Sequence, residues 1–266
     1  MQALFLSQPD AWLRYHDLPG RAPACVYLHG LASAASADFP ALVVQPALSG
    51  RRAVLVDLLG FGFSDRPRDF AYTLEDHART VAALLDHLGL TRCAIIGHSM
   101  GGSVAIVLTT LRPDLVGRLV VAEANLAPGL EEGSNAVFSR AVAAHTEDAF
   151  LRSGWQDMMH AMHAAFPAFA GQLNVADPRA VYRTAVSLVA ATQPSLEDQL
   201  SRAPAPATYV FGERSLAHED MAARAAALPA QGVTVRIVPN AGHSMGLEET
   251  PADFAELLAA ELSGNE

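Results

Sequence analysis

A short apolar strand runs directly into a Gly-x-Ser-x-Gly turn and then into a helix, and this arrangement restricts the fold more than any other feature. The strand is Cys93–Ile96, the turn is Gly97–Gly101, and the helix continues from Ser103. A serine at the centre of such a turn, here Ser99, projects its hydroxyl away from the backbone. Glycines at the flanking positions let the helix pack close to the strand. The pattern therefore predicts a nucleophile elbow that carries Ser99.

The order of elements around this turn predicts an α/β fold with a mostly parallel, doubly wound sheet. Apolar runs such as Val54–Val56 suit strands that are buried on both faces. Strand and helix candidates alternate from residue 23 onwards, as in sheets covered by helices on both sides. We expect strands near Pro23–His29, Arg52–Asp57, Arg92–His98, Arg118–Glu123, Ala207–Phe211 and Val233–Val238, with an antiparallel pair within Leu4–Tyr15.

One covering helix is marked at both ends. Thr73 and Asp76 have the spacing of a capping box at its start. Gly89 stops it, and apolar residues such as Val81 and Leu85 recur on one face between these limits. We expect this helix to lie against the sheet.

The alternation of strands and helices breaks after the fourth predicted parallel strand. Residues 126–202 are rich in helix formers and contain no convincing strand. We therefore expect a helical cap at 126–202, inserted into an α/β core that consists of residues 1–125 and 203–266.

An apolar stripe marks one helix of this expected cap. Trp155, Met159, Met162 and Phe166 recur at spacings of four, three and four, so they share one helical face. Such a stripe either packs the cap onto the core or lines an apolar pocket. Trp155, Met159 and Phe166 are accordingly the candidate substrate-binding residues.

Composition and charge limit the partners of this chain. Its 266 residues are 51% hydrophobic, enough for one large domain with a modest insertion. The formal charge of −10 opposes binding to nucleic acid or to an anionic membrane. No segment reaches the roughly 18 apolar residues of a membrane helix, and Met1–Asp10 does not resemble a signal peptide. We expect a cytoplasmic monomer or homodimer with a small-molecule substrate, and Cys25 and Cys93 as buried free thiols.

A histidine near the end of the chain is placed to act as a base. A serine hydroxyl needs a neighbouring base to become a nucleophile, and histidine is the usual one. His243 follows the last predicted strand in the glycine-containing loop Pro239–Met245. Since this loop leaves the same edge of the sheet as the elbow, we expect His243 to reach Ser99.

Backbone amides near the elbow are candidates for an oxyanion hole. The run Tyr27–Ser33 places a His-Gly turn at the end of the first long strand. From there the N–H of Leu31 can face the N–H of Met100, and such donors contribute roughly 3–4 kcal/mol each in related chemistry. His29 is expected to order this loop through its side chain.

Together these motifs resemble the α/β-hydrolase superfamily over nearly the whole chain. His29–Gly30 looks like the oxyanion loop of that superfamily, Asp57–Asp65 like its D-x-x-G-x-G-x-S turn, Gly97–Gly101 like its elbow, and Gly242–His243 like its base loop. The resemblance implies the chain order nucleophile, acid, histidine. It is specific for the fold and only weakly specific for a substrate.

The catalytic acid departs from the superfamily pattern. It usually stands after the penultimate strand as G-x-x-D, but Gly212–Ser215 has serine in that place. Either Glu213 substitutes from a shifted position, or the acid is Glu123 at the end of the strand after the elbow helix, a location that some members use. A carboxylate that ends so apolar a run is costly without a partner. His243 would be that partner, so Glu123 is favoured.

These residues predict a serine hydrolase of the carboxylesterase or lactonase kind. Ser99 would attack an ester or lactone carbonyl of a medium-sized apolar molecule, His243 would transfer the proton, and Glu123 would orient the imidazole. Water would release the acyl group, with no cofactor and no metal. The alternatives are a carbon–carbon bond hydrolase or a perhydrolase on the same triad, and a ligand-sensing receptor with vestigial hydrolysis.

Overall fold

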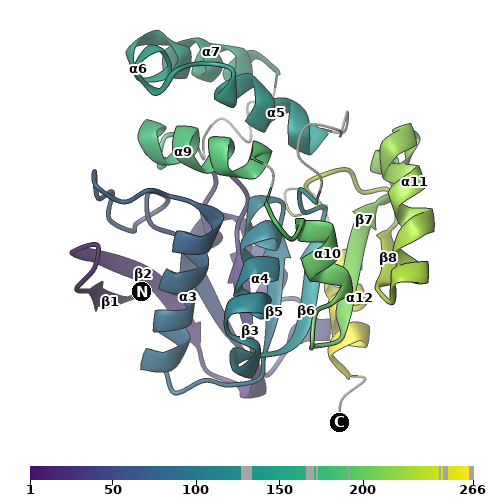
Figure 1. The fold of residues 1–266 in the computed structure, drawn as a ribbon. Helices are drawn as coiled ribbons and strands as arrows, with labels where there is room; N and C mark the ends of the chain where they lie inside the picture. The colour runs from purple at the N-terminus through teal and green to yellow at the C-terminus, as the bar shows by residue number, and fades with distance from the viewer. Residues whose placement is uncertain are drawn as a thin grey trace.

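An eight-stranded sheet runs through the middle of the molecule (Figure 1). The computed structural model describes residues 1–126, 134–165, 171, 173–190, 192–245, 247 and 251–263. The strand order is β1-β2-β4-β3-β5-β6-β7-β8. The strands are β1 (Gln2–Leu6), β2 (Ala11–Leu18), β3 (Arg21–Leu28), β4 (Arg51–Asp57), β5 (Cys93–His98), β6 (Val116–Ala122), β7 (Ala207–Gly212) and β8 (Thr234–Val238).

The pairing of the strands confirms the mostly parallel sheet. β1 and β2 form an antiparallel hairpin, and β2 pairs antiparallel with β4. From β4 to β8 every neighbouring pair is parallel. The boundaries of the six predicted parallel strands agree with the observed ones to within two residues. Buried apolar runs mark β3 to β7 in the sequence, whereas β8 is a mostly exposed edge strand.

Helices cover both faces of the sheet. The helices of the described residues, including those beyond the end of the sheet, are α1 (Ala35–Asp38), α2 (Pro40–Val43), α3 (Leu74–His87), α4 (Met100–Leu111), α5 (Ser134–Ala143), α6 (Glu147–Ala149), α7 (Trp155–Ala165), α9 (Pro178–Val189), α10 (Leu196–Ser201), α11 (Glu219–Ala227) and α12 (Pro251–Ser263). Short 3₁₀ turns lie at Pro46–Leu48, Pro113–Leu115, Glu213–Ala217 and Leu228–Gln231, and a π turn lies at Phe150–Gly154.

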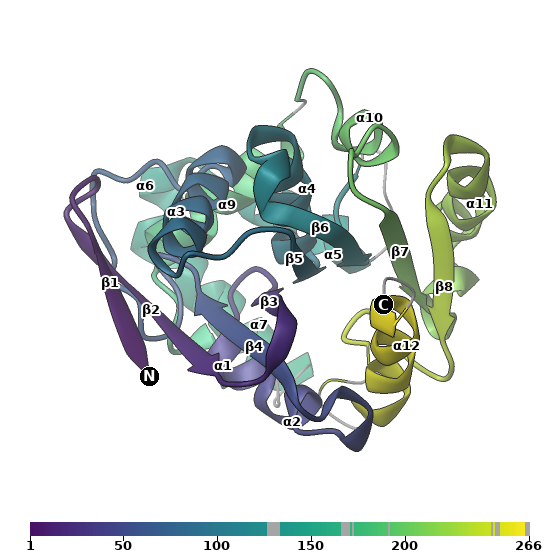
Figure 2. The same ribbon diagram turned by 90° about the horizontal axis from the view of Figure 1, so that it is seen from below.

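Two apolar layers form the core, one on each face of the sheet. Because successive residues of a strand point to opposite faces, Ile95 of β5 belongs to the layer under α3 and α4, whereas Ile96 belongs to the layer under α1, α2 and α12. Figure 2 shows these helices on the two sides of the sheet. In the described part of the chain no helix is long and apolar enough to cross a membrane.

Helix α3 begins and ends where its sequence predicts. The hydroxyl of Thr73 accepts a hydrogen bond from the backbone N–H of Asp76, whose carboxylate accepts one from the N–H of Thr73. This is the capping box, and it satisfies two amides that have no partner within the helix. Gly89 follows the last turn at φ +64°, a conformation that glycine adopts without strain.

The predicted helical insertion is present between β6 and β7. Figure 1 shows α5, α6, α7 and α9 beyond the end of the sheet at which β6 finishes, and we call these the cap helices. α10 instead packs against α4 on the core. The division of the chain at residues 125 and 202 stays a prediction.

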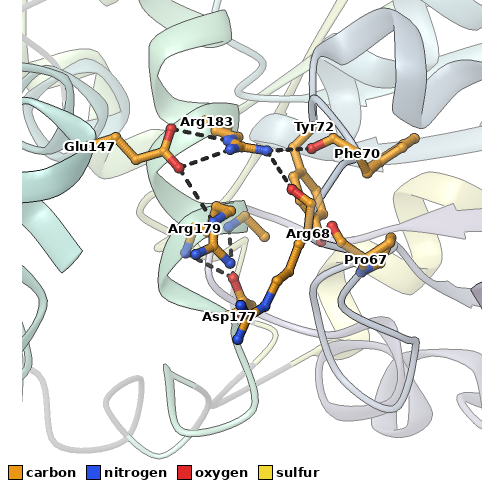
Figure 3. Close-up of polar contacts among 9 residues, drawn as sticks. Pro67, Arg68, Phe70, Tyr72, Glu147, Asp177, Arg179 and Arg183 are labelled. Atoms are coloured by element: carbon orange, nitrogen blue, oxygen red, sulfur yellow. Dashed lines mark hydrogen bonds and ion pairs between the residues drawn. The ribbon is translucent and has the colours of Figure 1, made fainter. Parts of the chain in front are cut away.

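One arginine joins the cap helices to the core (Figure 3). Nη1 of Arg183, on α9, donates to the carbonyl oxygens of Arg68 at 2.9 Å and Phe70 at 2.8 Å. Its Nε and Nη2 donate to the carboxylate of Glu147, on α6, at 3.1 and 2.9 Å. Glu147 also lies 3.4 Å from Nε of Arg179. A single guanidinium therefore ties α6 and α9 to the loop that precedes α3.

Candidate active site

Ser99 occupies a strained turn between β5 and α4. Its backbone has φ 51° and ψ −120°, and its N–H donates to the carbonyl of Ala122 at 2.8 Å. A β-carbon on Gly97 would lie 2.3 Å from the carbonyl oxygen of Gly101, and one on Gly101 would lie 2.2 Å from that of Leu28. Backbone strain of this kind costs about 1–3 kcal/mol and persists only where the surroundings enforce it. Close packing of α4 on the sheet enforces it here.

Glu123 and His243 are brought together from positions 120 residues apart. Oε2 of Glu123 lies 2.8 Å from Nδ1 of His243, and Oε1 accepts the N–H of Gly212 at 2.9 Å. The Glu123 side chain is fully buried, whereas that of His243 is 28% exposed. Burial by itself raises the pKa of the Glu123 carboxyl. The hydrogen bond and charge of His243 favour the ionised carboxylate, as do the Ser215 hydroxyl and the Gly212 N–H. Together these contacts outweigh the effect of burial and lower the pKa of Glu123 below its ordinary value.

This pairing fixes which nitrogen of His243 can act as a base. An ionised carboxylate only accepts hydrogen bonds, so Nδ1 of His243 carries a proton and donates it to Glu123. In the neutral ring Nε2 is then unprotonated and can accept a proton. The contact with Glu123 therefore leaves Nε2 as the nitrogen of His243 that can accept a proton, as a general base requires.

The alternative acid, Glu213, lies elsewhere. Its Oε2 accepts the N–H of Asn240 at 2.8 Å on the protein surface. The carboxylate therefore supports the loop that leads to His243, and the contact with the imidazole belongs to Glu123.

The residues at the usual position of the acid support Glu123 instead. Ser215, which replaces the aspartate of the G-x-x-D pattern, hydrogen-bonds to Glu123. Gly212 donates its N–H to the same carboxylate, and a β-carbon there would lie 2.4 Å from the carbonyl oxygen of Gly242. Sequence reasoning missed these supporting roles, although the serine at the end of Gly212–Ser215 was a signal for them.

His29 orders the candidate oxyanion loop. Its Nε2 accepts the N–H of Leu58 at 3.1 Å, so the neutral ring carries its proton on Nδ1 and donates it to the carbonyl of Gly30 at 2.8 Å. Burial lowers the pKa of His29, which favours this neutral form. Within the described residues, neither Leu31 nor Met100 has a hydrogen-bond acceptor for its backbone N–H. Leu31 and Met100 therefore stay the candidate donors of the oxyanion hole.

The candidate substrate-binding residues are only partly placed. Trp155 and Met159 lie on α7, half-buried, and pack against the apolar core together with Met158 and Met162. Phe166 lies outside the described residues. Because these contacts are packing contacts, the role of Trp155 and Met159 in lining a pocket stays a prediction.

Other reactive side chains form no further centre in the part of the chain that is described. No group of three or more histidine, cysteine, aspartate or glutamate side chains is arranged to hold a metal there. Cys25 and Cys93 are free and buried, and burial raises the pKa of each thiol to about 11. They belong to opposite apolar layers of the sheet.

Comparison with known proteins identifies the family to which this chain belongs. The chain belongs to the α/β hydrolase fold family, whose sequence model matches residues 23–250. A stretch of 114 residues is 40% identical to the sn-1-specific diacylglycerol lipase ABHD11 of Mus musculus and covers 42% of this chain and 36% of the lipase. Another stretch of 125 residues is 33% identical to the 2-hydroxymuconate semialdehyde hydrolase of Pseudomonas sp. strain CF600. It covers 46% of this chain and 44% of that hydrolase.

Both matches span less than half of the relative's length. The structure also resembles an esterase from Thermogutta terrifontis, with a TM-score of 0.76 over 98% of each chain. Since only 23% of the aligned residues are identical, this likeness shows the fold alone.

Proposed function

We propose that this protein is a serine hydrolase that cleaves an ester or lactone bond through an acyl-enzyme intermediate. The observation that carries the proposal is the 2.8 Å contact between Nδ1 of His243 and the buried, ionised Glu123, beside the elbow that presents Ser99. The diacylglycerol lipase, to which part of the chain is 40% identical, supports an ester substrate.

The proposed reaction uses two proton transfers through one histidine. His243 takes the proton of Ser99 through Nε2 while the serine oxygen attacks the carbonyl carbon. The N–H groups of Leu31 and Met100 donate to the oxyanion that forms. His243 then gives the proton to the departing alcohol. Nε2 of His243 next takes a proton from water as the water oxygen attacks the acyl-enzyme, and it returns that proton to the Ser99 oxygen as the acid leaves. Glu123 stays ionised throughout.

The proposed substrate is a medium-sized, weakly polar ester or lactone. The apolar side chains of α7, among them Trp155, Met159 and Met162, favour an acyl or alcohol group without charge. A carbon–carbon bond hydrolase or a perhydrolase would use the same residues, but no contact among the described residues favours either.

Covalent labelling with a fluorophosphonate tests the proposal. We expect one phosphonyl group per chain, located on Ser99 by peptide mass spectrometry, with complete loss of esterase activity. The labelling rate should fall as the pH is lowered, because protonated His243 cannot accept the serine proton.

The acid limb of this profile should correspond to a single proton. The lowered pKa of Glu123 keeps its carboxylate ionised while a histidine takes up a proton, and His98, whose pKa burial lowers to about 3, stays neutral. Labelling on another residue, or a labelling rate that does not fall as the pH is lowered, contradicts the proposal. A single burst of product per chain without turnover would instead indicate a receptor.

Shortening Trp155 should separate large substrates from small ones. We expect Trp155→Ala to raise KM for a hexanoate ester about tenfold, since a lost apolar contact in a pocket is worth roughly 1–3 kcal/mol. KM for the acetate ester should change by less than about twofold, because a small acyl group makes few contacts with α7. Equal losses for both esters in a folded variant would show that Trp155 only packs α7 onto the core.

A further inference from the structure

His98 joins the elbow to the loop that carries the candidate base. It is the last residue of β5 and directly precedes Ser99. Alternation along the strand places it on the same face as Ile96, in the layer that also contains α12. The His243 loop lies between β8 and α12. There Nε2 of His98 lies 2.7 Å from the carbonyl oxygen of His243, and the two rings are 4.9 Å apart.

Only one protonation state of His98 fits these contacts. A carbonyl oxygen accepts hydrogen bonds, so Nε2 carries the proton and donates it to His243. Nδ1 is buried and has no hydrogen-bond partner in the described part of the chain. Burial first, and then the charge of the neighbouring His243, lower the pKa of His98 to about 3. The ring therefore stays neutral and offers one donor.

Among the described residues, three hydrogen bonds from outside the loop reach its backbone, and one of these ends on His243 itself, whose side chain also contacts Glu123. Glu213 accepts the N–H of Asn240 at 2.8 Å, and the N–H of Arg214 donates to the carbonyl of Ala241 at 2.8 Å. The contact from His98 is the third, and it fixes the peptide group from which the imidazole extends. A displacement of about 1 Å in a catalytic group can lower a rate about a hundredfold.

We propose that His98 is a positioning residue for His243. Its Nε2–H holds the carbonyl of His243 so that Nδ1 of that imidazole meets Glu123 while Nε2 faces Ser99. This inference rests on the proposed serine-hydrolase function. It assigns a role to the variable residue before the serine in the Gly-x-Ser-x-Gly turn.

The neutral state of His98 matters because His243 becomes positively charged during the reaction. Among the described residues, the ionisable groups facing His98 are His243, Glu123 and His29. A second cation 4.9 Å from the His243 ring would oppose the imidazolium that Glu123 stabilises. A buried imidazole avoids this repulsion, whereas a lysine or arginine at position 98 would not.

Four variants separate positioning from simple packing. His98→Gln keeps an amide N–H close to the place of Nε2, whereas His98→Asn is one methylene shorter and His98→Leu has no donor. We expect His98→Leu and His98→Asn to lower kcat for a short ester about thirtyfold with KM changed less than twofold. His98→Gln should stay within about threefold of the wild type.

The fourth variant, His77→Leu, is the matched control. His77 is also buried, its Nδ1 also lacks a partner among the described residues, and burial lowers its pKa to about 3 as well. Its Nε2 contacts Thr184 of α9 at 3.2 Å, away from the His243 loop. His77→Leu should keep kcat within about threefold, even where its melting temperature falls.

A spectroscopic signal reports the position of the base directly. The Nδ1–H proton between His243 and Glu123 should give a downfield proton resonance in the wild type and in His98→Gln, and this resonance should broaden or vanish in His98→Asn. Should His98→Leu not fold, the comparison of the glutamine and asparagine variants decides. Equal kcat values for the glutamine and asparagine variants overturn the proposal. A loss of kcat in His77→Leu as large as that in His98→Leu also overturns it. A fully active Ser99→Ala, measured beside them, would instead overturn the proposed function itself.

Discussion

Ser99→Ala should lower kcat for a short-chain p-nitrophenyl ester at least about a thousandfold. Without the hydroxyl no acyl-enzyme forms, and His243 and Glu123 have no nucleophile to activate. The residual rate would come from the oxyanion donors and from substrate binding. Steady-state kinetics with circular dichroism as a check on folding measures this effect.

A second serine on the same helix provides the control. Ser103 is buried one turn further along α4, where its hydroxyl donates to the carbonyl of Asn125 at 3.2 Å. Ser103→Ala removes a buried hydroxyl of the same size and should keep kcat within about threefold. A folded Ser99→Ala that retains more than a tenth of wild-type activity would rule out the serine-hydrolase mechanism.

Glu123→Gln should reduce kcat by orders of magnitude, about ten-thousandfold in the comparable serine-protease substitution, with KM largely unchanged. The amide can still accept the N–H of Gly212, so the local fold is kept. Its NH₂ group, however, would face Nδ1 of His243 and favour the tautomer that carries its proton on Nε2. That tautomer cannot accept the proton of Ser99.

Glu213→Gln is the matched control for this substitution. Its amide oxygen can still accept the N–H of Asn240, so the base loop keeps its support. We expect kcat within about tenfold of the wild type. A strongly impaired Glu213→Gln beside a nearly normal Glu123→Gln would assign the acid to Glu213. Two mild effects would indicate that another group orients His243.

Acid should reduce the difference in the free energy of unfolding between the wild type and Glu123→Gln. The folded-state pKa of Glu123 is lowered, so its ionised form contributes stability that is present above the ordinary carboxylate pKa. This contribution is lost as the pH falls through the lowered value. The free energy of unfolding of the wild type should therefore approach that of Glu123→Gln as the solution becomes acidic.

Local patterns in the sequence were sufficient for much of the fold. The buried strands β3 to β7 are predictable because each contains an apolar run. Helix α3 is predictable because a capping box marks its first turn and Gly89 follows its last turn. The elbow followed from Gly97 and Gly101, since each leaves too little space for a β-carbon. These features depend on residues that are close in sequence.

The role of the apolar stripe on α7 could not be decided in this way. Trp155 and Met159 would be apolar both in a helix that packs on the core and in one that lines a pocket. The structure shows them packed against the core, and Phe166 lies outside the described residues. The prediction of a pocket therefore still depends on the substrate experiment.

The choice between two acids separates what the sequence determined from what only the tertiary structure decided. The sequence determined that Glu123 and Glu213 each follow a buried strand, and that Ser99 and His243 lie on turns at one edge of the sheet. Only the folded chain shows that Oε2 of Glu123 meets Nδ1 of His243 while Glu213 meets the backbone of Asn240. A hydrogen bond depends on tenths of an ångström and on direction, and between residues 120 positions apart these are set by strand pairing and loop packing rather than by neighbouring residues.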